Sequence, residues 1–504
     1  MTCRSCVLAI SLLTVGLAGC AKAPVALSIP HLDPLQQLAQ DIAAATSLPG
    51  VQRAAWGIVV HSLDRDERVF DLNPRTLLVP ASVAKLVSLA AAVDAVGWDF
   101  RFETTVRATA PLVDGVLHGD LLLVGSGDPS IGGRAGQDLS VWVDALWALG
   151  LRRIDGRIIG DDDAVEEPRP QLAWAWDDLG YSTGVLFGAL NLGENRMTVT
   201  VNPALSLGDT PTLSVEASAW SRPLRNRTVT GAPGSPLLIW PEQRPGEPFL
   251  TIAGSVPAGS PSAQLSVSAG NPTFWFASGL RVALLGGGIE VTGDAYDVDD
   301  VARRPEWEGA TVLSTYRSPT LAEIAQPLLK DSINLYGEAV LRLNADRGSL
   351  PTNDAALEGL GTRLAAWGVP PDAWQIIDGS GLSRRNAVAP ETLVAVLQRM
   401  YDPSGSSPWM TGLPVAGRDG TLAGRMKGTP AEDNLRAKTG TMSNIRTLAG
   451  YVRTRDDEAL AFAIMADNFE GSGSAATEAI DRIAVRLAAF SRDSRLAAAA
   501  TTEH

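Results

Sequence analysis

The stretch VPASVAKLVSLAAAVDAVG, residues 79–97, is almost entirely apolar and yet contains one lysine, Lys85. Its length, its composition and its closing glycine predict a buried helix that ends near Gly97. Ser82 precedes the lysine by three residues, so this helix would place both side chains on one face, about one turn apart. Because the chain has only five lysines against 37 arginines, a lysine in such an apolar helix indicates a chemical role.

The pair of Ser82 and Lys85 suits nucleophilic catalysis. A serine hydroxyl is a poor nucleophile until a base takes its proton, and a lysine amine can be that base when burial and a neighbouring cation lower its pKa. The start of a helix also favours developing negative charge, because free N–H groups and the helix dipole meet there. Taken alone, the spacing equally fits a capping serine and a lysine whose amine reaches the surface.

Two further lysine-containing motifs favour the catalytic interpretation. They are KDSINLYGE, residues 330–338, with Ser332 and Asn334, and RAKTGTM, residues 436–442, with Lys438, Thr439, Gly440 and Thr441. Ser-x-x-Lys, Ser-x-Asn and Lys-Thr-Gly, in this chain order, resemble the motif set of β-lactamases and penicillin-binding proteins. Ser-x-Asn is common by chance, but Lys-Thr-Gly in so lysine-poor a chain is not.

The chemistry of these residue types predicts a role for each in acyl transfer. Ser82 would attack an acyl carbon while Lys85 removes its proton. Ser332 would relay a proton to the leaving amine, and Asn334 would donate a hydrogen bond to the substrate amide. The oxyanion hole would consist of the backbone N–H groups of Ser82 and Thr441.

The Lys-Thr-Gly motif would bind the substrate. Lys438 supplies a second positive charge, which would keep Lys85 neutral and attract a carboxylate. The hydroxyls of Thr439 and Thr441 would donate hydrogen bonds to that carboxylate. Gly440 would let the strand edge approach the substrate closely, because it lacks a side chain.

A competing motif, GYSTG at residues 180–184, fits the Gly-x-Ser-x-Gly pattern of α/β-hydrolases. That mechanism needs a histidine later in the chain, and the only one after Ser182 is His504, the last residue. The four histidines offer neither a triad base nor a metal cluster, so we expect no metal and no other cofactor.

The composition limits the class of protein. The chain has 504 residues, of which 45% are hydrophobic and 19% charged, so it is long enough for two or three domains with large cores. The net charge of −14 and the absence of a Lys/Arg-rich block argue against a nucleic-acid partner.

The N-terminus reads as an export signal. The apolar run from Val7 to Gly19 is too short to span a bilayer comfortably, so it predicts a signal peptide. It ends in LAGC, which resembles a bacterial lipobox and predicts lipidation of Cys20. We therefore expect a periplasmic protein anchored by its N-terminal lipid, on the outer membrane in a Gram-negative source because Ala21 follows the cysteine. The mature fold would have no other thiol, which excludes disulfides and cysteine catalysis.

The two ends of the chain carry similar patterns, and short β-like runs separate them. One end predicts a helix over 35–46 and a hairpin over 54–73; the other predicts helices over 320–345, 357–368, 390–401 and about 475–492 and a hairpin over 444–467. Both hairpins could share one antiparallel sheet. The expected fold class is α/β: an antiparallel sheet flanked by helices, with small inserted β-rich domains.

With these residues in place, the chain resembles the low-molecular-mass class C penicillin-binding proteins, the D-alanyl-D-alanine carboxypeptidase/endopeptidase family. The resemblance covers nearly all of the mature chain and includes the segments GDLLLVGSGDPS, WAWDDLGYSTGVLFGALNLGEN, DGSGLSRRN and LPVAGRDGTLAGRM. It implies a β-lactamase/transpeptidase-like domain and a Ser82 acyl-enzyme that releases D-Ala from peptidoglycan stem peptides or cross-links and is inhibited by β-lactams. It also implies an acidic residue of the insert that contacts the stem-peptide amine, for which Asp161 is the best match.

The resemblance divides the chain into five parts. They are a lipoprotein signal peptide over 1–19, a tether over 20–35, a catalytic domain over 36–99 and 310–495, two inserted β-rich domains over 100–309, and a disordered tail over 496–504. Two alternatives stay open: a β-lactamase, against which the 250-residue separation of Ser82 and Ser332 argues, and a non-catalytic penicillin-binding cell-wall lipoprotein.

Overall fold

The computed structural model describes residues 33–215, 223–244, 246–302, 309–346, 348 and 350–493. The predicted signal peptide, Cys20 and the predicted C-terminal tail lie outside these residues. The described chain mixes helices and sheets, which confirms the predicted α/β class. Within the described residues, no helix combines the length and apolar character needed to cross a membrane.

A five-stranded antiparallel sheet forms the centre of one lobe, in the order β2-β1-β22-β21-β20. Its strands are β1 (Ala55–Ser62), β2 (Glu67–Leu72), β20 (Arg436–Met442), β21 (Ile445–Arg453) and β22 (Ala459–Asp467). The prediction that the two hairpins share one sheet is confirmed, because β1 pairs with β22. Every residue of β22 is buried, since helices cover both faces, and its sequence is accordingly apolar from residue 459 to residue 466, before the buried Asp467.

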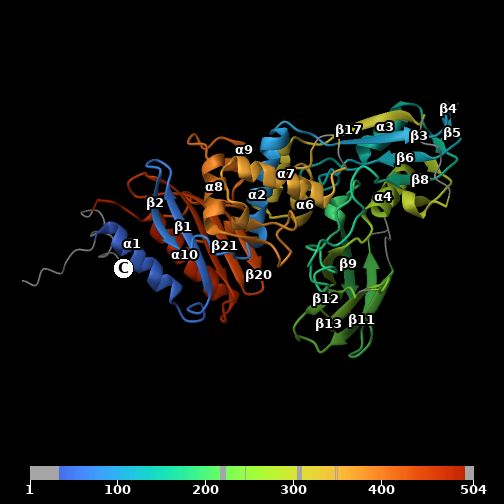
Figure 1. Ribbon diagram of the computed structural model, residues 1–504. Helices are drawn as coiled ribbons and strands as arrows, with labels where there is room; N and C mark the ends of the chain where they lie inside the picture. Colours follow the sequence, from blue (N-terminus) through green and yellow to red (C-terminus); the bar gives the residue numbers. More distant parts are fainter. Residues whose placement is uncertain are drawn as a thin grey trace, which may run out of the picture.

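Helices cover both faces of this sheet (Figure 1). One face packs against α1 (Pro34–Thr46) and α10 (Gly473–Ala488), which come from the two ends of the chain. The opposite face packs against a helical layer of α2 (Ala84–Val96), α5 (Leu321–Lys330), α6 (Asn334–Arg342), α7 (Asn353–Ala366), α8 (Pro390–Met400) and α9 (Pro408–Gly412). Short strands β18 (Trp374–Gln375) and β19 (Ala387–Val388) pair beside this layer.

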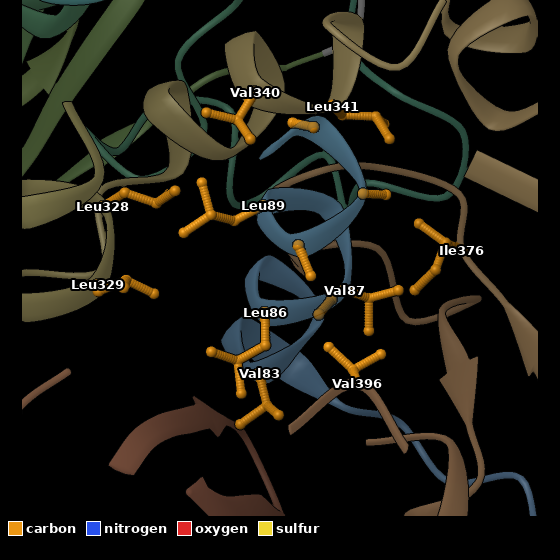
Figure 2. Close-up of a cluster of buried hydrophobic side chains, with 14 of the residues drawn as sticks. Val83, Leu86, Val87, Leu89, Leu328, Leu329, Val340, Leu341, Ile376 and Val396 are labelled. Atoms are coloured by element: carbon orange, nitrogen blue, oxygen red, sulfur yellow. The ribbon is translucent and has the colours of Figure 1, made fainter. Parts of the chain in front are cut away.

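The apolar stretch 79–97 forms a short 3₁₀ turn, η1 (Ala81–Val83), that leads into α2. The helix ends at Gly97, whose φ of 80° only glycine adopts readily, as the sequence predicts. Figure 2 shows its side chains surrounded by the neighbouring helices; the labelled residues include Leu86, Val87, Leu89, Leu328, Leu329, Val340, Leu341 and Val396. Residues 84–92 of α2 are all buried, so packed side chains surround the part of the helix that carries Lys85 and follows Ser82.

The predicted helical segment over 320–345 is interrupted at Ser332. Helix α5 ends at Lys330 and α6 begins at Asn334, and Ser332 between them has a φ of 62°. A non-glycine residue in this left-handed conformation is unusual and is often found at functional sites. The break places Ser332 between the two helices and Asn334 at the start of α6.

A second lobe lies between α2 and α5 in sequence (Figure 1). In the described residues, the larger sheet of its first part contains β3 (Glu103–Ala108), β6 (Leu121–Val124), β8 (Ile158–Asp161), β16 (Ala295–Asp297) and β17 (Thr311–Arg317). A smaller sheet contains β4 (Leu112–Val113), β5 (Val116–Leu117), β7 (Arg153–Ile154) and β15 (Glu290–Val291). The helices of this part are α3 (Ser140–Ala148) and α4 (Pro272–Gly286). These helices make this part more helical than the sequence indicates. Strand β17 pairs with β3, so the inserted sheet extends past residue 309, where we expected the insert to end.

The other part of the second lobe is all β. It contains a sheet of β10 (Thr212–Val215), β9 (Arg196–Asn202) and β14 (Ala263–Ser268), and a sheet of β11 (Leu224–Gly231), β13 (Leu250–Pro257) and β12 (Leu238–Glu242). These two sheets share a small core of their own, around Val199, Ile252 and Val267.

Candidate active site

A cleft of about 390 Å³ lies where the N-terminal end of η1, the break before α6 and strand β20 meet. The residues that line it are Ser82, Asp178, Thr183, Asp331, Ser332, Asn334, Gly381, Leu382, Arg384, Thr421, Thr439, Thr441, Met442 and Ser443. All three sequence motifs therefore contribute to one cleft, although successive motifs lie about 250 and about 100 residues apart in the chain.

The centre of the cleft is the pair predicted to carry the chemistry. The Nζ of Lys85 lies 2.9 Å from the Oγ of Ser82, 2.8 Å from the Oδ1 of Asn334 and 2.5 Å from the carbonyl oxygen of Ser380. Lys85 is fully buried, which rules out an amine that reaches the surface. The amine is therefore held against the serine hydroxyl by two acceptors, one side-chain oxygen and one backbone oxygen.

Burial changes the proton affinity of Lys85. Desolvation lowers the pKa of its amine to about 7, and the negative charges of Asp378 and Glu338 partly oppose this shift. Near neutral pH the amine is thus neutral in a large fraction of molecules, as a general base must be. Burial is the main cause, and the charge of Lys438, which we expected to keep the amine neutral, is not among the causes of the shift.

Lys438 occupies the other side of the cleft, on β20. Its Nζ donates to the Oγ of Ser332 at 2.8 Å and to the carbonyl of Thr439 at 2.9 Å. Burial and the neighbouring charge of Lys85 lower the pKa of Lys438 as well. The two lysines and Ser332 are thus brought together, as the motif order predicts.

Strand β20 forms the edge of the cleft. Thr439 donates through its Oγ1 to the Oγ1 of Thr421 at 2.7 Å, and Thr439 and Thr441 both line the cleft. A side chain at Gly440 would collide with the hydroxyl of Thr447 and the carbonyl of Pro80. The small residue therefore lets β20 pack against the segment that carries the nucleophile, a different reason from the close substrate approach that we expected.

The structure does not bring Asp161 into the cleft. This residue ends β8, and its carbonyl accepts from the N–H of Gly125 within the inserted part at 3.1 Å. The connecting segment, residues 162–187, then crosses to the lobe built around the five-stranded sheet, which we call the catalytic lobe. It places Asp178 and Thr183 at the cleft. Burial and the nearby Asp177 raise the pKa of Asp178, and Arg384 lowers it.

Hydrogen bonds fasten the connecting segment to the catalytic lobe, and one of them runs from the N–H of Asn353 to the Oε2 of Glu166 at 2.8 Å. The Nδ2 of Asn334 donates to the carbonyl of Thr183 at 2.8 Å, Trp174 donates to Asp378 at 2.7 Å, and Ser383 donates to the carbonyl of Leu172 at 2.9 Å. The GYSTG motif lies in this segment, in a turn without the strand and helix of a nucleophile elbow. Ser182 is thus not the nucleophile of an α/β-hydrolase.

An antiparallel sheet flanked by helices, with a serine and a buried lysine at the start of one helix, defines a serine hydrolase of the β-lactamase/transpeptidase-like fold. The model of the D-Ala-D-Ala carboxypeptidase 3 (S13) family matches residues 38–490, and the chain belongs to this family. The resemblance drawn from the three motifs is thereby confirmed.

Individual relatives agree with the family assignment. A D-alanyl-D-alanine carboxypeptidase from Actinomadura sp. is 33% identical, over 90% of this chain and 85% of that protein. The crystal structure of penicillin binding protein 4 (dacB) from Haemophilus influenzae is similar with a TM-score of 0.76 at 22% identity, over 90% of this chain and 98% of that one. A second structure of that protein, complexed with a β-lactam, has a TM-score of 0.70 at 21% identity. At this identity the crystal structures show the shared fold.

Proposed function

We propose that the chain cleaves D-Ala-D-Ala termini, or D-Ala cross-links, of peptidoglycan stem peptides through an acyl-enzyme on Ser82. The observation that carries this proposal is the fully buried Lys85 amine, 2.9 Å from the Ser82 hydroxyl and with its pKa lowered to about 7. The family and the relative named as a D-alanyl-D-alanine carboxypeptidase support the substrate class.

Acylation begins when the neutral Lys85 amine takes the hydroxyl proton of Ser82. The serine oxygen then bonds to the carbonyl carbon of the penultimate D-Ala, and the backbone N–H groups of Ser82 and Thr441 hold the developing oxyanion. Lys438, through Ser332 at 2.8 Å, supplies the route by which a proton reaches the leaving amine. The proton that Lys85 took from Ser82 passes by this route to the leaving nitrogen, the C–N bond breaks and free D-Ala leaves. Water then hydrolyses the acyl-enzyme, and its proton restores the hydroxyl of Ser82.

The rim of the cleft selects the substrate. The hydroxyl of Thr441 donates to the terminal carboxylate, and that of Thr439 does so by rotating its hydrogen away from Thr421. Asp178 and Arg384 line the cleft farther along and interact electrostatically, so they offer a negative and a positive group to the stem-peptide side chain. We expect Asp178→Asn to raise KM about tenfold for a stem peptide with a free side-chain amine, and less for one whose amine is acetylated.

β-Lactams enter the same cleft as acylating inhibitors. Their ring carbonyl and carboxylate correspond in chemistry to the scissile amide and terminal carboxylate of D-Ala-D-Ala. The β-lactam complex of the Haemophilus influenzae protein of the same fold supports this part of the proposal.

The enzyme is a periplasmic lipoprotein in this proposal, processed at Cys20 and held on the outer membrane. The signal-like N-terminus and the LAGC sequence support it. The test is fractionation of cells that express the full chain or Cys20→Ser. The full chain should be in the membrane fraction and the variant in the soluble periplasm; equal distribution of both would contradict lipid anchoring.

The activity is tested on a synthetic stem pentapeptide ending in D-Ala-D-Ala and on a cross-linked dimer, with the chain from residue 21. Release of D-Ala, or of monomers, by the wild type and not by Ser82→Ala is the expected result. Stable penicillin labelling without either release would favour the non-catalytic lipoprotein instead. Rapid turnover of nitrocefin would favour the β-lactamase.

A further inference from the structure

A buried group of four charged residues lies behind the proposed general base. They are at most 5% exposed and come from three parts of the chain: Lys85 on α2, Glu338 and Arg342 on α6, and Asp378 in the loop before β19. Burial of unpaired charge is costly, so such a group is retained where its hydrogen bonds are satisfied or where it has a function. The mechanism above uses only the lysine.

The other members of this group converge on Ser380. The backbone N–H of Ser380 donates to the Oε1 of Glu338 at 2.9 Å, and the next N–H, of Gly381, donates to the Oδ1 of Asp378 at 2.6 Å. The carbonyl of Ser380 accepts from the Lys85 amine at 2.5 Å. Two carboxylates therefore hold the amides on both sides of this residue and aim its carbonyl at the base.

The position of the Ser380 carbonyl helps to determine the direction of the lone pair on the Lys85 amine. The Ser380 carbonyl is an acceptor, and so is the Oδ1 of Asn334, whose Nδ2 donates to the carbonyl of Thr183 at 2.8 Å. A neutral amine has two N–H bonds and one lone pair. With both N–H bonds directed at these acceptors, the lone pair faces the hydroxyl of Ser82, which is the orientation that proton removal requires.

The carboxylates of Asp378 and Glu338 differ in how many hydrogen bonds they accept. Asp378 accepts from Trp174, from the N–H groups of Gly381 and Ser383, and from Asn386, so it holds the loop together. The Oε2 of Glu338 has no hydrogen-bond partner among the described residues, and the guanidinium of Arg342 lies 3.7 Å from it. Glu338 is thus the less constrained of the two charges near Lys85.

Helix α6 carries both Asn334, whose Oδ1 accepts from the Lys85 amine, and Glu338, which accepts from the N–H of Ser380. Asn334 is its first residue and Glu338 follows four residues later, on the same face of the helix. Gly337 and Gly379 face each other, and a side chain on either would collide with the backbone of the other. This close contact seats α6 directly against the loop that carries Ser380.

We propose that Glu338 is a positioning residue for the general base: by accepting the N–H of Ser380 it aims the Ser380 carbonyl at the Lys85 amine. Where its carboxyl is ionised it also places a negative charge near the amine, and burial raises the pKa of that carboxyl to about 7. The proposal rests on the proposed role of Lys85. The charged groups that face this pair are Asp378 from the loop, Arg342 from α6 and Lys438 from β20, and beyond Arg342 stand Glu166 and Arg169 of the connecting segment.

The test is the second-order rate constant of acylation by benzylpenicillin as a function of pH, for the wild type, Glu338→Gln and Glu338→Asp. Glu338→Gln keeps an acceptor for the Ser380 N–H and removes the charge. Where Glu338 is ionised, the protonated amine then loses an attractive neighbour. Because the pKa of Glu338 is itself raised to about 7, the acidic limb of the profile should move lower by up to about one pH unit. Glu338→Asp keeps the carboxylate, but its shorter side chain does not reach the N–H of Ser380. The rate constant at the plateau of the profile should therefore fall about tenfold, while the pH of the acidic limb stays unchanged.

The matched control is Glu458→Gln, which removes a buried, ion-paired carboxylate beside β22, away from the cleft. It should lower the melting temperature and leave the pH profile unchanged. Profiles of Glu338→Gln and Glu338→Asp that superimpose on the wild type would overturn the proposal. If Glu338→Gln does not fold, an undiminished plateau in Glu338→Asp overturns it. Absence of acylation in the wild type would instead contradict the proposed function.

Discussion

Lys85 is the residue at which function costs stability most clearly. Its amine is fully buried, and desolvation brings its pKa from the ordinary 10.5 to about 7. The fold tolerates this because three oxygens surround the amine, from Ser82, Asn334 and Ser380. The same surroundings that make the charged form unfavourable make the neutral form a base.

Replacement of this lysine by arginine should separate charge from basicity. A guanidinium stays protonated at any relevant pH, so Lys85→Arg cannot take the proton of Ser82. We expect the rate constant for acylation by benzylpenicillin to fall by about 10²–10⁴-fold, the usual contribution of a general base. Lys330→Arg is the control, since Lys330 pairs with Asp419 at 2.7 Å. A Lys85→Arg enzyme as active as this control would contradict the assignment.

The predicted residues that the structure brings together in the cleft are those with a spacing rule. Ser82 and Lys85 are one helical turn apart, and the other two motifs contain fixed triplets, so each is visible locally. Asp178 and Arg384 have no such spacing: an acidic or basic residue in a turn looks like any solvated charge. Asp161, which the resemblance favoured, is not among the residues that line the cleft, whereas Asp178 is. An acidic run at a strand end attracts more notice than one aspartate in an irregular segment.

Helix α2 is the element on which the site depends. Its apolar composition allows burial on all sides, and the packed side chains of α5, α6 and α8 leave it no freedom to shift (Figure 2). The nucleophile and the base are both fixed through this helix. Loss of packing around α2 should therefore lower stability and catalysis together.

Leu89→Ala tests this dependence. Leu89 is fully buried in the core around α2, so its truncation should lower the free energy of unfolding by about 2–5 kcal/mol, through lost burial and a residual cavity. Chemical denaturation monitored by circular dichroism measures the change. Leu205→Ala, at a fully exposed leucine, should change it by less than about 0.5 kcal/mol. Equal effects of the two substitutions would contradict the packing account.

The elements themselves were largely readable from the sequence. Alternating or continuous apolar runs with Gly, Pro and Asp turns located both hairpins, and helical periodicity located α1, α7, α8 and α10. The break at Ser332 was not readable, because the residues around it have good helical character and tertiary contacts impose the positive φ. The end of the insert was misjudged because β17 pairs with β3, some 200 residues earlier.

At the scale of the whole molecule, buried carboxyl groups occur in both lobes. Burial raises the pKa of four of them, to about 6 or about 7: Asp128, Asp162, Glu338 and Asp467. A carboxyl whose pKa is raised by folding contributes stability that is complete below its ordinary pKa and is lost as the pH rises through the folded value. Near neutral pH, all four therefore destabilise the fold.

The melting temperature should consequently rise as the pH falls from about 7 to about 5. Lys438 acts in the opposite direction, because its pKa is lowered, but it is one group against four. Below about pH 7, Lys85 is protonated in both the folded and the unfolded state. It therefore does not make the melting temperature depend on pH in this range. Differential scanning calorimetry measures the trend, and Asp467→Asn should reduce its slope. A melting temperature that falls throughout this range would contradict the account.

The central claim is that Ser82 forms the acyl-enzyme with Lys85 as its base. The most direct measurement is intact mass spectrometry of the chain from residue 21 after treatment with benzylpenicillin, followed by peptide mapping of the adduct. The account predicts one penicilloyl group on the wild type, mapped to Ser82, and none on Ser82→Ala. An adduct on another residue, or labelling that persists in Ser82→Ala, would contradict it.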